Sequence, residues 1–175
     1  SVFPHALADK QYSELWLQYE IKFLDGFTWV KGGKLPGLAG YLGEVKPTGC
    51  VSNDQVEGFS ARFMWRENGQ VLQYMYHPEK QKRCGDYHSL GKFFQKGRWH
   101  TITSYVRLSD FSENNGSVKN SSVKNGLVKA YLDGELLLEL DNLNLRSDEN
   151  ITINSLLFET FFGGGSMSWA PETDQ

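Results

Sequence analysis

The chain has 175 residues, which suits one domain with a substantial core, and we expect a single domain over 1–175. Hydrophobic residues make up 39% and aromatic residues 14%, a composition that excludes a disordered chain. The formal net charge of −3 gives no overall positive field for nucleic acid, and no apolar run approaches the roughly 18 residues of a membrane span. We therefore expect no nucleic-acid and no membrane partner.

Alternation with a period of two dominates the sequence, and helical periodicity is almost absent. It is clearest over residues 15–23, LWLQYEIKF, where apolar residues recur at every second position. Further strands are predicted at 59–66, 70–77, 99–108, 127–132, 135–140 and 151–162. Many short strands separated by turn residues indicate an all-β sandwich, jelly roll or barrel.

Two polar segments are predicted to be loops. Lys31–Gly37, KGGKLPG, follows a strand ending near Val30, and its lysines could reach over a neighbouring cleft. It is not a phosphate-binding loop, because its Gly-Lys pair is followed by Leu and no helix follows. Ser109–Asn125, rich in Ser, Asn and Lys, is predicted to be an exposed loop insertion.

Asp133-Gly134, between two apolar runs, predicts a two-residue hairpin, because both central positions of a type I′ turn need positive φ. The hairpin around Glu67-Asn68-Gly69 has two possible registers. A two-residue loop would put Arg62 on the same face as Met75.

A three-residue loop, with Gly69 in the left-handed position of a bulge, would instead pair Arg62 with Tyr74 and Ser60 with Tyr76. We favour this register, because it keeps the arginines and tyrosine hydroxyls out of the apolar layer. The opposite face then carries a credible core: Phe59, Ala61, Phe63, Trp65, Val71 and Met75.

The face carrying Ser60, Arg62, Tyr74 and Tyr76 suits an acidic sugar. Arginine forms paired hydrogen bonds with a carboxylate, tyrosine rings support sugar faces, and hydroxyls carry protons. The alternative is a solvated sheet face above buried tyrosines that has no functional role.

The two cysteines, Cys50 and Cys84, could form one disulfide, although their count alone does not distinguish a bond from two free thiols. Three possible glycan acceptors, Asn115, Asn120 and Asn150, favour a secreted protein. We therefore expect an extracellular location.

Other chemistries have weaker signals. His77 and His88, with Asp86 between them, could be arranged as metal ligands, but no HExxH or paired CxxC spacing is present, and we expect no metal. No G-x-S-x-G elbow supports a serine hydrolase, and no pair of acids supports a glycosidase.

Four segments in order along the chain are KGGKLPG at 31–37, FSARFMW at 59–65, YMYH at 74–77 and FETFFGG at 158–164. Together they resemble polysaccharide lyase family 14, which includes alginate and glucuronan lyases. The likeness covers nearly the whole chain. It implies a β-jelly roll whose concave sheet holds an endolytic lyase site.

The resemblance carries the functional residues of the family onto Lys34, Ser60, Arg62, Tyr74 and Tyr76. It implies β-elimination on uronic-acid polymers, most of all mannuronate-rich alginate, with Arg62 neutralising the carboxylate. The base would be Tyr76 or Lys34, with Tyr74 as the other proton carrier and Ser60 as a positioning donor. Lys31, Arg66, His77 and Lys80 are candidates for outer contacts to further sugars, and the alternative for each is a solvated side chain without a role.

This scheme needs no metal or organic cofactor, and we expect a monomer acting on an acidic polysaccharide, alginate or glucuronan. An aromatic-rich closing strand is also expected after Trp169, so terminal strands could be missing from the chain. The competing hypothesis is a non-catalytic lectin-like module, because 99–102 and 131–135 are also similar to laminin-G and concanavalin-like sandwiches. A glycosidase on the same sandwich would give products without a double bond.

Overall fold

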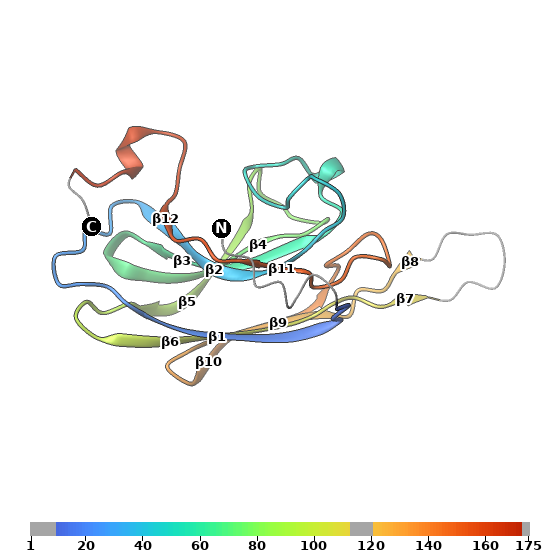
Figure 1. Cartoon of the computed structure of the whole chain (residues 1–175), viewed down its shortest axis with the longest axis horizontal. Coiled ribbons are helices and arrows are strands. Elements are labelled where there is room, and N and C mark those ends of the chain that lie inside the picture. The colour runs from blue at the N-terminus through green and yellow to red at the C-terminus, as the bar shows by residue number, and fades with distance from the viewer. Residues whose placement is uncertain (1–9, 113–120, 173–175) are drawn as a thin grey trace.

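The computed structural model describes residues 10–112 and 121–172 and consists of two antiparallel β-sheets packed face to face (Figure 1). The smaller sheet has the order β1 (Glu14–Lys22), β6 (Trp99–Arg107), β9 (Gly126–Leu132), β10 (Glu135–Leu143). The larger has the order β11 (Ser155–Leu157), β2 (Gly32–Gly40), β3 (Phe59–Arg66), β4 (Gln70–Tyr76), β5 (Asp86–Phe93), and β12 (Phe161–Phe162) also pairs with β2. The predicted all-β jelly roll is thus confirmed.

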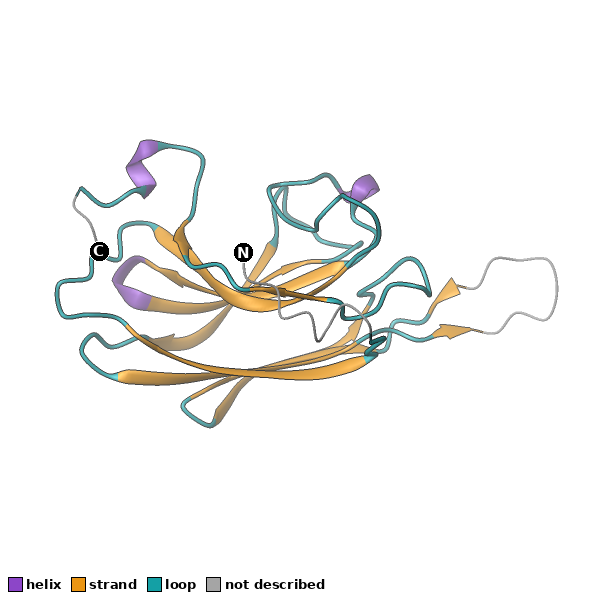
Figure 2. Cartoon of the chain, in the orientation of Figure 1, coloured by secondary structure: helices purple, strands orange, loops and turns teal. Residues whose placement is uncertain are grey.

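Helical structure within the described residues is limited to three single turns of 3₁₀-helix (Figure 2). These are η1 (Asn53–Gln55), η2 (Glu67–Gly69) and η3 (Met167–Trp169). No helix in the described part of the chain has the length and apolar character needed to cross a membrane.

The predicted strands agree with the structure at six of the seven ranges, with ends that shift by up to three residues. The seventh, 151–162, is wrong as one strand, because it divides into β11 and β12. Both pieces pair with β2, and Phe158, Glu159 and Thr160 between them leave the ladder. The interruption places Glu159, between β11 and β12, in the lining of the cleft described below.

The prediction of a glycine-rich loop at Lys31–Gly37 is wrong, because most of this segment is strand β2. Its glycines are required because the neighbouring strand β3 lies too close for a side chain. A Cβ on Gly33 would lie 2.1 Å from the Trp65 ring, and one on Gly37 would lie 2.0 Å from the Ala61 carbonyl oxygen. Strand β5 was also missed, since it lies at a sheet edge with little apolar alternation.

Both hairpins follow the predicted turns. Asp133 and Gly134 have φ of 52° and 84°, and they join β9 to β10 with Leu132 opposite Glu135. Between β3 and β4 the three-residue loop is confirmed, with positive φ at Asn68 as well as at Gly69. This register places Arg62 opposite Tyr74 and Ser60 opposite Tyr76.

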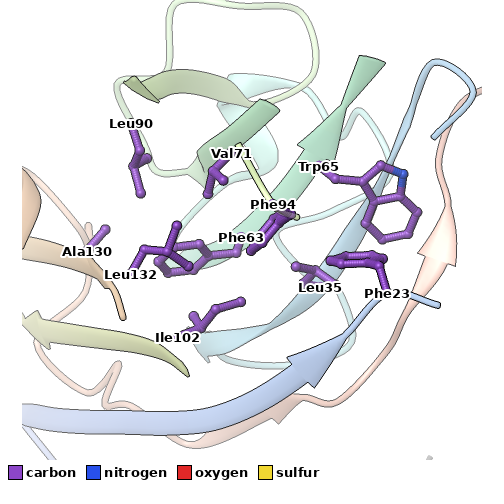
Figure 3. Packing of buried hydrophobic residues seen from close by; sticks show 10 residues of the cluster. All are labelled: Phe23, Leu35, Phe63, Trp65, Val71, Leu90, Phe94, Ile102, Ala130 and Leu132. Atoms are coloured by element: carbon purple, nitrogen blue, oxygen red, sulfur yellow. The ribbon is translucent and has the colours of Figure 1, made fainter. Parts of the chain in front are cut away.

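The apolar core fills the space between the two sheets. Figure 3 shows Phe63 and Val71 of the larger sheet pointing toward Ile102 and Leu132 of the smaller one. The predicted core face of β3 and β4 is buried throughout, comprising Phe59, Ala61, Phe63, Trp65, Val71 and Met75. Apolar burial on this face leaves the other face of the larger sheet available for a site.

The polar segment Ser109–Asn125 is only partly a loop. Two-residue strands β7 (Phe111–Ser112) and β8 (Ser121–Ser122) pair within it. Ser109 is buried, and its hydroxyl donates to the Leu143 carbonyl oxygen and accepts from the Leu145 N–H. The predicted glycan acceptors Asn115 and Asn120 lie outside the described residues, whereas Asn150 is exposed.

Candidate active site

A cleft of about 780 Å³ lies on the face of the larger sheet turned away from the core. Its floor is formed by alternate residues of three neighbouring strands: Lys34 of β2, Ser60, Arg62, Met64 and Arg66 of β3, and Leu72, Tyr74 and Tyr76 of β4. Loop residues complete the lining: 48–50, 82–85, Glu159, Gly163–Gly165 and Trp169. In Figure 1 the segments bearing η1 and η3 rise on this side of the sheet.

All five predicted catalytic residues line this one cleft. Four come together because β3 and β4 alternate in register, which directs Ser60, Arg62, Tyr74 and Tyr76 to the same face. Lys34 joins them from β2, where the pairing with β3 shifts between Lys34 and Gly37. The bulge in β2 therefore places an amine beside the tyrosines.

The Lys34 ammonium lies over an aromatic ring, 4.6 Å from the centroid of Tyr74. Its Nζ is also 5.7 Å from the Phe161 ring centroid. Burial, and then the positive charges of Arg62 and Arg66, lower the pKa of Lys34 to about 8. A lysine with this pKa is partly neutral near physiological pH and can accept a proton.

The Arg62 guanidinium is held by three hydrogen bonds to its surroundings. Nε donates to the Leu35 carbonyl oxygen at 3.1 Å and Nη2 to the Glu159 carbonyl oxygen at 3.1 Å. Nη1 lies 3.4 Å from Glu159 Oε2, with the Arg62 side chain 3% and the Glu159 side chain 47% exposed. Burial lowers the pKa of Arg62 from its very high ordinary value, and Glu159 opposes that shift, so the group stays charged. The cleft thus contains the fixed, buried cation of Arg62 and, beside it, the partly exposed carboxylate of Glu159.

The two tyrosine hydroxyls form a hydrogen-bonded pair. Tyr74 donates to Tyr76 at 3.4 Å, and each oxygen accepts one backbone N–H, from Gly85 at 2.9 Å for Tyr74 and from Cys50 at 2.8 Å for Tyr76. Burial, and then the hydrogen bond with Tyr76, raise the pKa of Tyr74 above its ordinary value. Tyr74 is therefore protonated at neutral pH and can give a proton.

Ser60 is buried, and its hydroxyl donates to the Pro47 carbonyl oxygen at 2.7 Å. Its proton is therefore used within the protein, and the bond attaches the β2–β3 loop to the cleft floor. This contact fits a positioning role for Ser60.

Of the four predicted outer contacts, the structure places one in the cleft and three outside it. Arg66 lines the cleft, with its guanidinium carbon 5.3 Å from the Trp169 ring centroid. Lys31, His77 and Lys80 are outside the cleft lining. Lys31 Nζ donates to Ser168 Oγ at 2.7 Å, next to the lining residue Trp169.

Lys80 and His77 have internal partners. Lys80 is 2% exposed, and its Nζ donates to Asn53 Oδ1 and to the carbonyl oxygens of Lys82 and Arg83. His77 Nε2 lies 3.2 Å from Asp86 Oδ2. Lys80 is thus placed to join loops rather than to face a sugar.

Residues that sequence analysis did not single out also line the cleft: Tyr87, Lys82, Arg83, Glu159, Phe161 and Trp169. Glu159 and Phe161 belong to the FETFFGG motif, which contributed to the family resemblance but gave neither residue a role. Tyr87 lies on the unpredicted strand β5, and its position follows only from the pairing of that strand with β4.

Cys50 and Cys84 form a disulfide, which joins the β2–β3 loop to the β4–β5 loop beside the cleft.

Within 10–112 and 121–172, no group of three or more His, Cys, Asp or Glu side chains is arranged to hold a metal ion. The carboxylate of Asp86, which lies between the two histidines in sequence, accepts the backbone N–H groups of Gln81 and Lys82. It organises the β4–β5 loop.

The fold and the cleft define a β-jelly-roll protein with a basic, tyrosine-bearing groove. The sequence profile of the Polysaccharide lyase 14 family matches residues 3–175, and the chain belongs to this family. No curated protein sequence matches it.

Solved structures share this fold. Alginate lyase vAL-1 from Chlorella virus has a TM-score of 0.71 and 23% identity, covering 88% of this chain and 64% of its own. A double mutant of alginate lyase Aly36B, in complex with alginate trisaccharide, has a TM-score of 0.73 and 23% identity, covering 94% and 66%. The marine PL-14 alginate lyase from Aplysia kurodai has a TM-score of 0.66 and 24% identity, covering 91% and 64%. The chain therefore spans less than two thirds of these enzymes' length.

Proposed function

We propose that this chain is an endolytic lyase that cleaves 1,4-linked uronic-acid polymers by β-elimination. The observation that carries the proposal is the pairing in one cleft of Lys34, whose pKa is lowered to about 8, with Tyr74, whose pKa is raised. Two groups whose environments move their pKa values in opposite senses are suited to act as base and acid.

The first requirement of the reaction is to neutralise the uronate carboxylate, because the C5 proton beside an ionised carboxylate is only weakly acidic. Arg62 supplies a fixed positive charge for this purpose, since its backbone partners hold the guanidinium in place. A substrate carboxylate would replace the long contact from Glu159 Oε2.

The bond changes then follow. The neutral Lys34 amine takes the C5 proton, and the electron pair of that C–H bond forms the C4–C5 double bond. The C4–O4 bond breaks, and the Tyr74 hydroxyl turns from its long contact with Tyr76 and gives its proton to O4. Tyr76 can then donate its own hydroxyl to the Tyr74 phenolate, and proton transfer from the Lys34 ammonium to that phenolate, directly or through solvent, restores both groups.

For the substrate we propose mannuronate-rich alginate, with glucuronan as the second candidate. The basic and aromatic lining supports an acidic sugar polymer, because Lys34, Arg62 and Arg66 attract carboxylates while the exposed Tyr87 offers a ring face. The alginate trisaccharide bound to the Aly36B mutant supports alginate in particular. The family likeness supports the endolytic mode.

The experiment is to incubate the purified chain separately with polymannuronate, polyguluronate and glucuronan and to follow the ultraviolet absorbance of the unsaturated uronate. We expect the fastest rise with polymannuronate, and oligosaccharides of mixed length as the first products. Polymer binding without any rise in absorbance would instead support a lectin-like module. New reducing ends without the double bond would support a glycosidase.

We also propose that the protein acts outside the cell as a monomer. The disulfide supports an oxidising location, because such bonds are rare in reducing compartments. Size-exclusion chromatography with light scattering tests the oligomeric state. Detection of the protein in the culture medium of its native cells tests the location.

A further inference from the structure

We infer that the Cys50–Cys84 disulfide is a positioning device for the tyrosine pair, because it holds one backbone N–H donor on each phenolic oxygen. The inference rests on the proposed function for its catalytic consequence. The position of the donors can be measured without any assay of activity.

The bridge joins the two loops that supply both donors. The Cys50 N–H donates to the Tyr76 oxygen at 2.8 Å, and the N–H of Gly85, the neighbour of Cys84, donates to the Tyr74 oxygen at 2.9 Å. The cross-linked residues are 34 apart in sequence, and their loops are separated along the chain by the β3–β4 hairpin. One covalent bond therefore fixes both amides relative to the same pair of hydroxyls.

The backbone of Cys50 needs such support. Its φ is +62°, next to Gly49 at +66°, and a non-glycine residue is disfavoured in this left-handed region. This conformation accompanies the N–H contact with Tyr76. When the bridge is cut, we expect Cys50 to relax toward an ordinary conformation and its N–H to move away from that oxygen.

A second contact between the same loops allows reduction without their separation. Lys80 Nζ donates to Asn53 Oδ1 at 2.6 Å, and Asn53 Nδ2 donates to the Lys80 carbonyl oxygen at 2.7 Å. These bonds do not involve the tyrosine hydroxyls. Cutting the disulfide should therefore misalign the donors while the loops remain folded.

The test compares the oxidised protein, the phosphine-reduced protein and the Cys50→Ser/Cys84→Ser variant. Amide hydrogen exchange at residue 50 and at Gly85 reports the two donors directly, and thermal melting reports folding. Loss of a hydrogen bond worth about 1.4 kcal/mol predicts roughly tenfold faster exchange at both amides and a roughly tenfold lower kcat, with a smaller change in KM. The double variant should resemble the reduced protein and be insensitive to the phosphine.

Ser147→Ala is the matched control. Ser147 Oγ donates to the Glu57 carbonyl oxygen at 3.1 Å, which attaches the same β2–β3 loop at its far end from Cys50. This variant should leave exchange at Cys50 and Gly85 unchanged.

Faster exchange at both amides with a fall mainly in kcat, reversed by reoxidation, supports the inference. Unchanged exchange on reduction, or an unchanged kcat in an active enzyme, overturns it. If the oxidised protein has no lyase activity on any uronate polymer, the proposed function fails, and the exchange data alone then decide whether the bridge positions the donors.

Discussion

The Lys34 ammonium lies 4.6 Å from the ring centroid of Tyr74, although the two residues belong to strands separated by β3. The bulge in β2 and the alternation of β4 turn both side chains to the same face. The same burial lowers the pKa of the amine and raises that of the phenol, because it disfavours whichever form carries charge. One partly buried cleft thereby prepares an acceptor and a donor of protons.

Lys34→Arg separates a base from a simple cation at this position. Arginine keeps the positive charge but does not lose its proton, so we expect kcat to fall by about 100-fold or more while polymer binding is largely kept. In the unmodified enzyme, kcat/KM should rise as pH increases through about 8, because the neutral amine is the form that accepts the C5 proton. Retention of turnover in the arginine variant would assign the base elsewhere.

Tyr74→Phe removes the proposed acid. With a polysaccharide substrate we expect kcat to fall by roughly 100-fold or more, since the departing O4 needs a proton. A uronide with a nitrophenolate leaving group at C4 needs no such proton, so Tyr74→Phe should cleave it nearly as well as the unmodified enzyme does. Lys34→Arg is the comparison, because it should remain slow on both substrates. Equal defects on both would contradict the role of Tyr74 as acid.

Glu159→Gln should strengthen the binding of the polyanion. The Glu159 carboxylate, 3.4 Å from the Arg62 guanidinium, repels a substrate carboxylate and competes with it for Arg62. Two unit charges about 4 Å apart in water interact by about 1 kcal/mol. We expect KM to fall by roughly fivefold at low salt and the difference to shrink at high salt. Glu139→Gln, on the outer strand β10 of the other sheet, makes the same charge change and should leave KM unaltered. A higher KM in Glu159→Gln would instead indicate that the carboxylate binds the sugar.

The hairpins were predictable from sequence because their information is local. Asp133-Gly134 and Glu67-Asn68-Gly69 each contain residues that accept positive φ, and the turn then sets the pairing of the following strand. The patch formed by Ser60, Arg62, Tyr74 and Tyr76 followed from that register. Lys34 could be connected with it only through the family resemblance.

What could not be predicted depends on contacts between segments distant in sequence. Gly33 and Gly37 look like loop residues until Trp65 and the Ala61 carbonyl oxygen are placed against them. The buried site of Lys80 likewise depends on Asn53, in a different loop. A surface lysine and a loop-joining lysine have the same appearance in sequence, so only the fold separates them.

Gly37→Ala tests whether β2 needs its glycine. The added Cβ would lie 2.0 Å from the Ala61 carbonyl oxygen, which belongs to the backbone of the paired strand and has little freedom to move. We expect the free energy of unfolding to fall by about 2–4 kcal/mol in a chemical denaturation experiment. Gly26→Ala is the control, since among the described residues no atom other than those of Gly26 and its two chain neighbours lies within 4 Å of its Cβ position, and its effect should stay within about 0.5 kcal/mol. Equal stability of the two variants would show that the strands separate easily at Gly37.

Lys80→Met and Lys82→Met distinguish a structural lysine from a substrate-facing one. Lys80→Met leaves Asn53 Oδ1 and two backbone carbonyl oxygens without their buried donor, so we expect a loss of about 3 kcal/mol in stability. Lys82 lines the cleft and is exposed, so its loss should raise KM for the polymer with little change in melting temperature. Thermal melting and steady-state kinetics on both variants check the pair. If Lys80→Met melted normally but bound the polymer weakly, the side chain would have to leave its buried site to contact sugar, and the loop-joining role would be wrong.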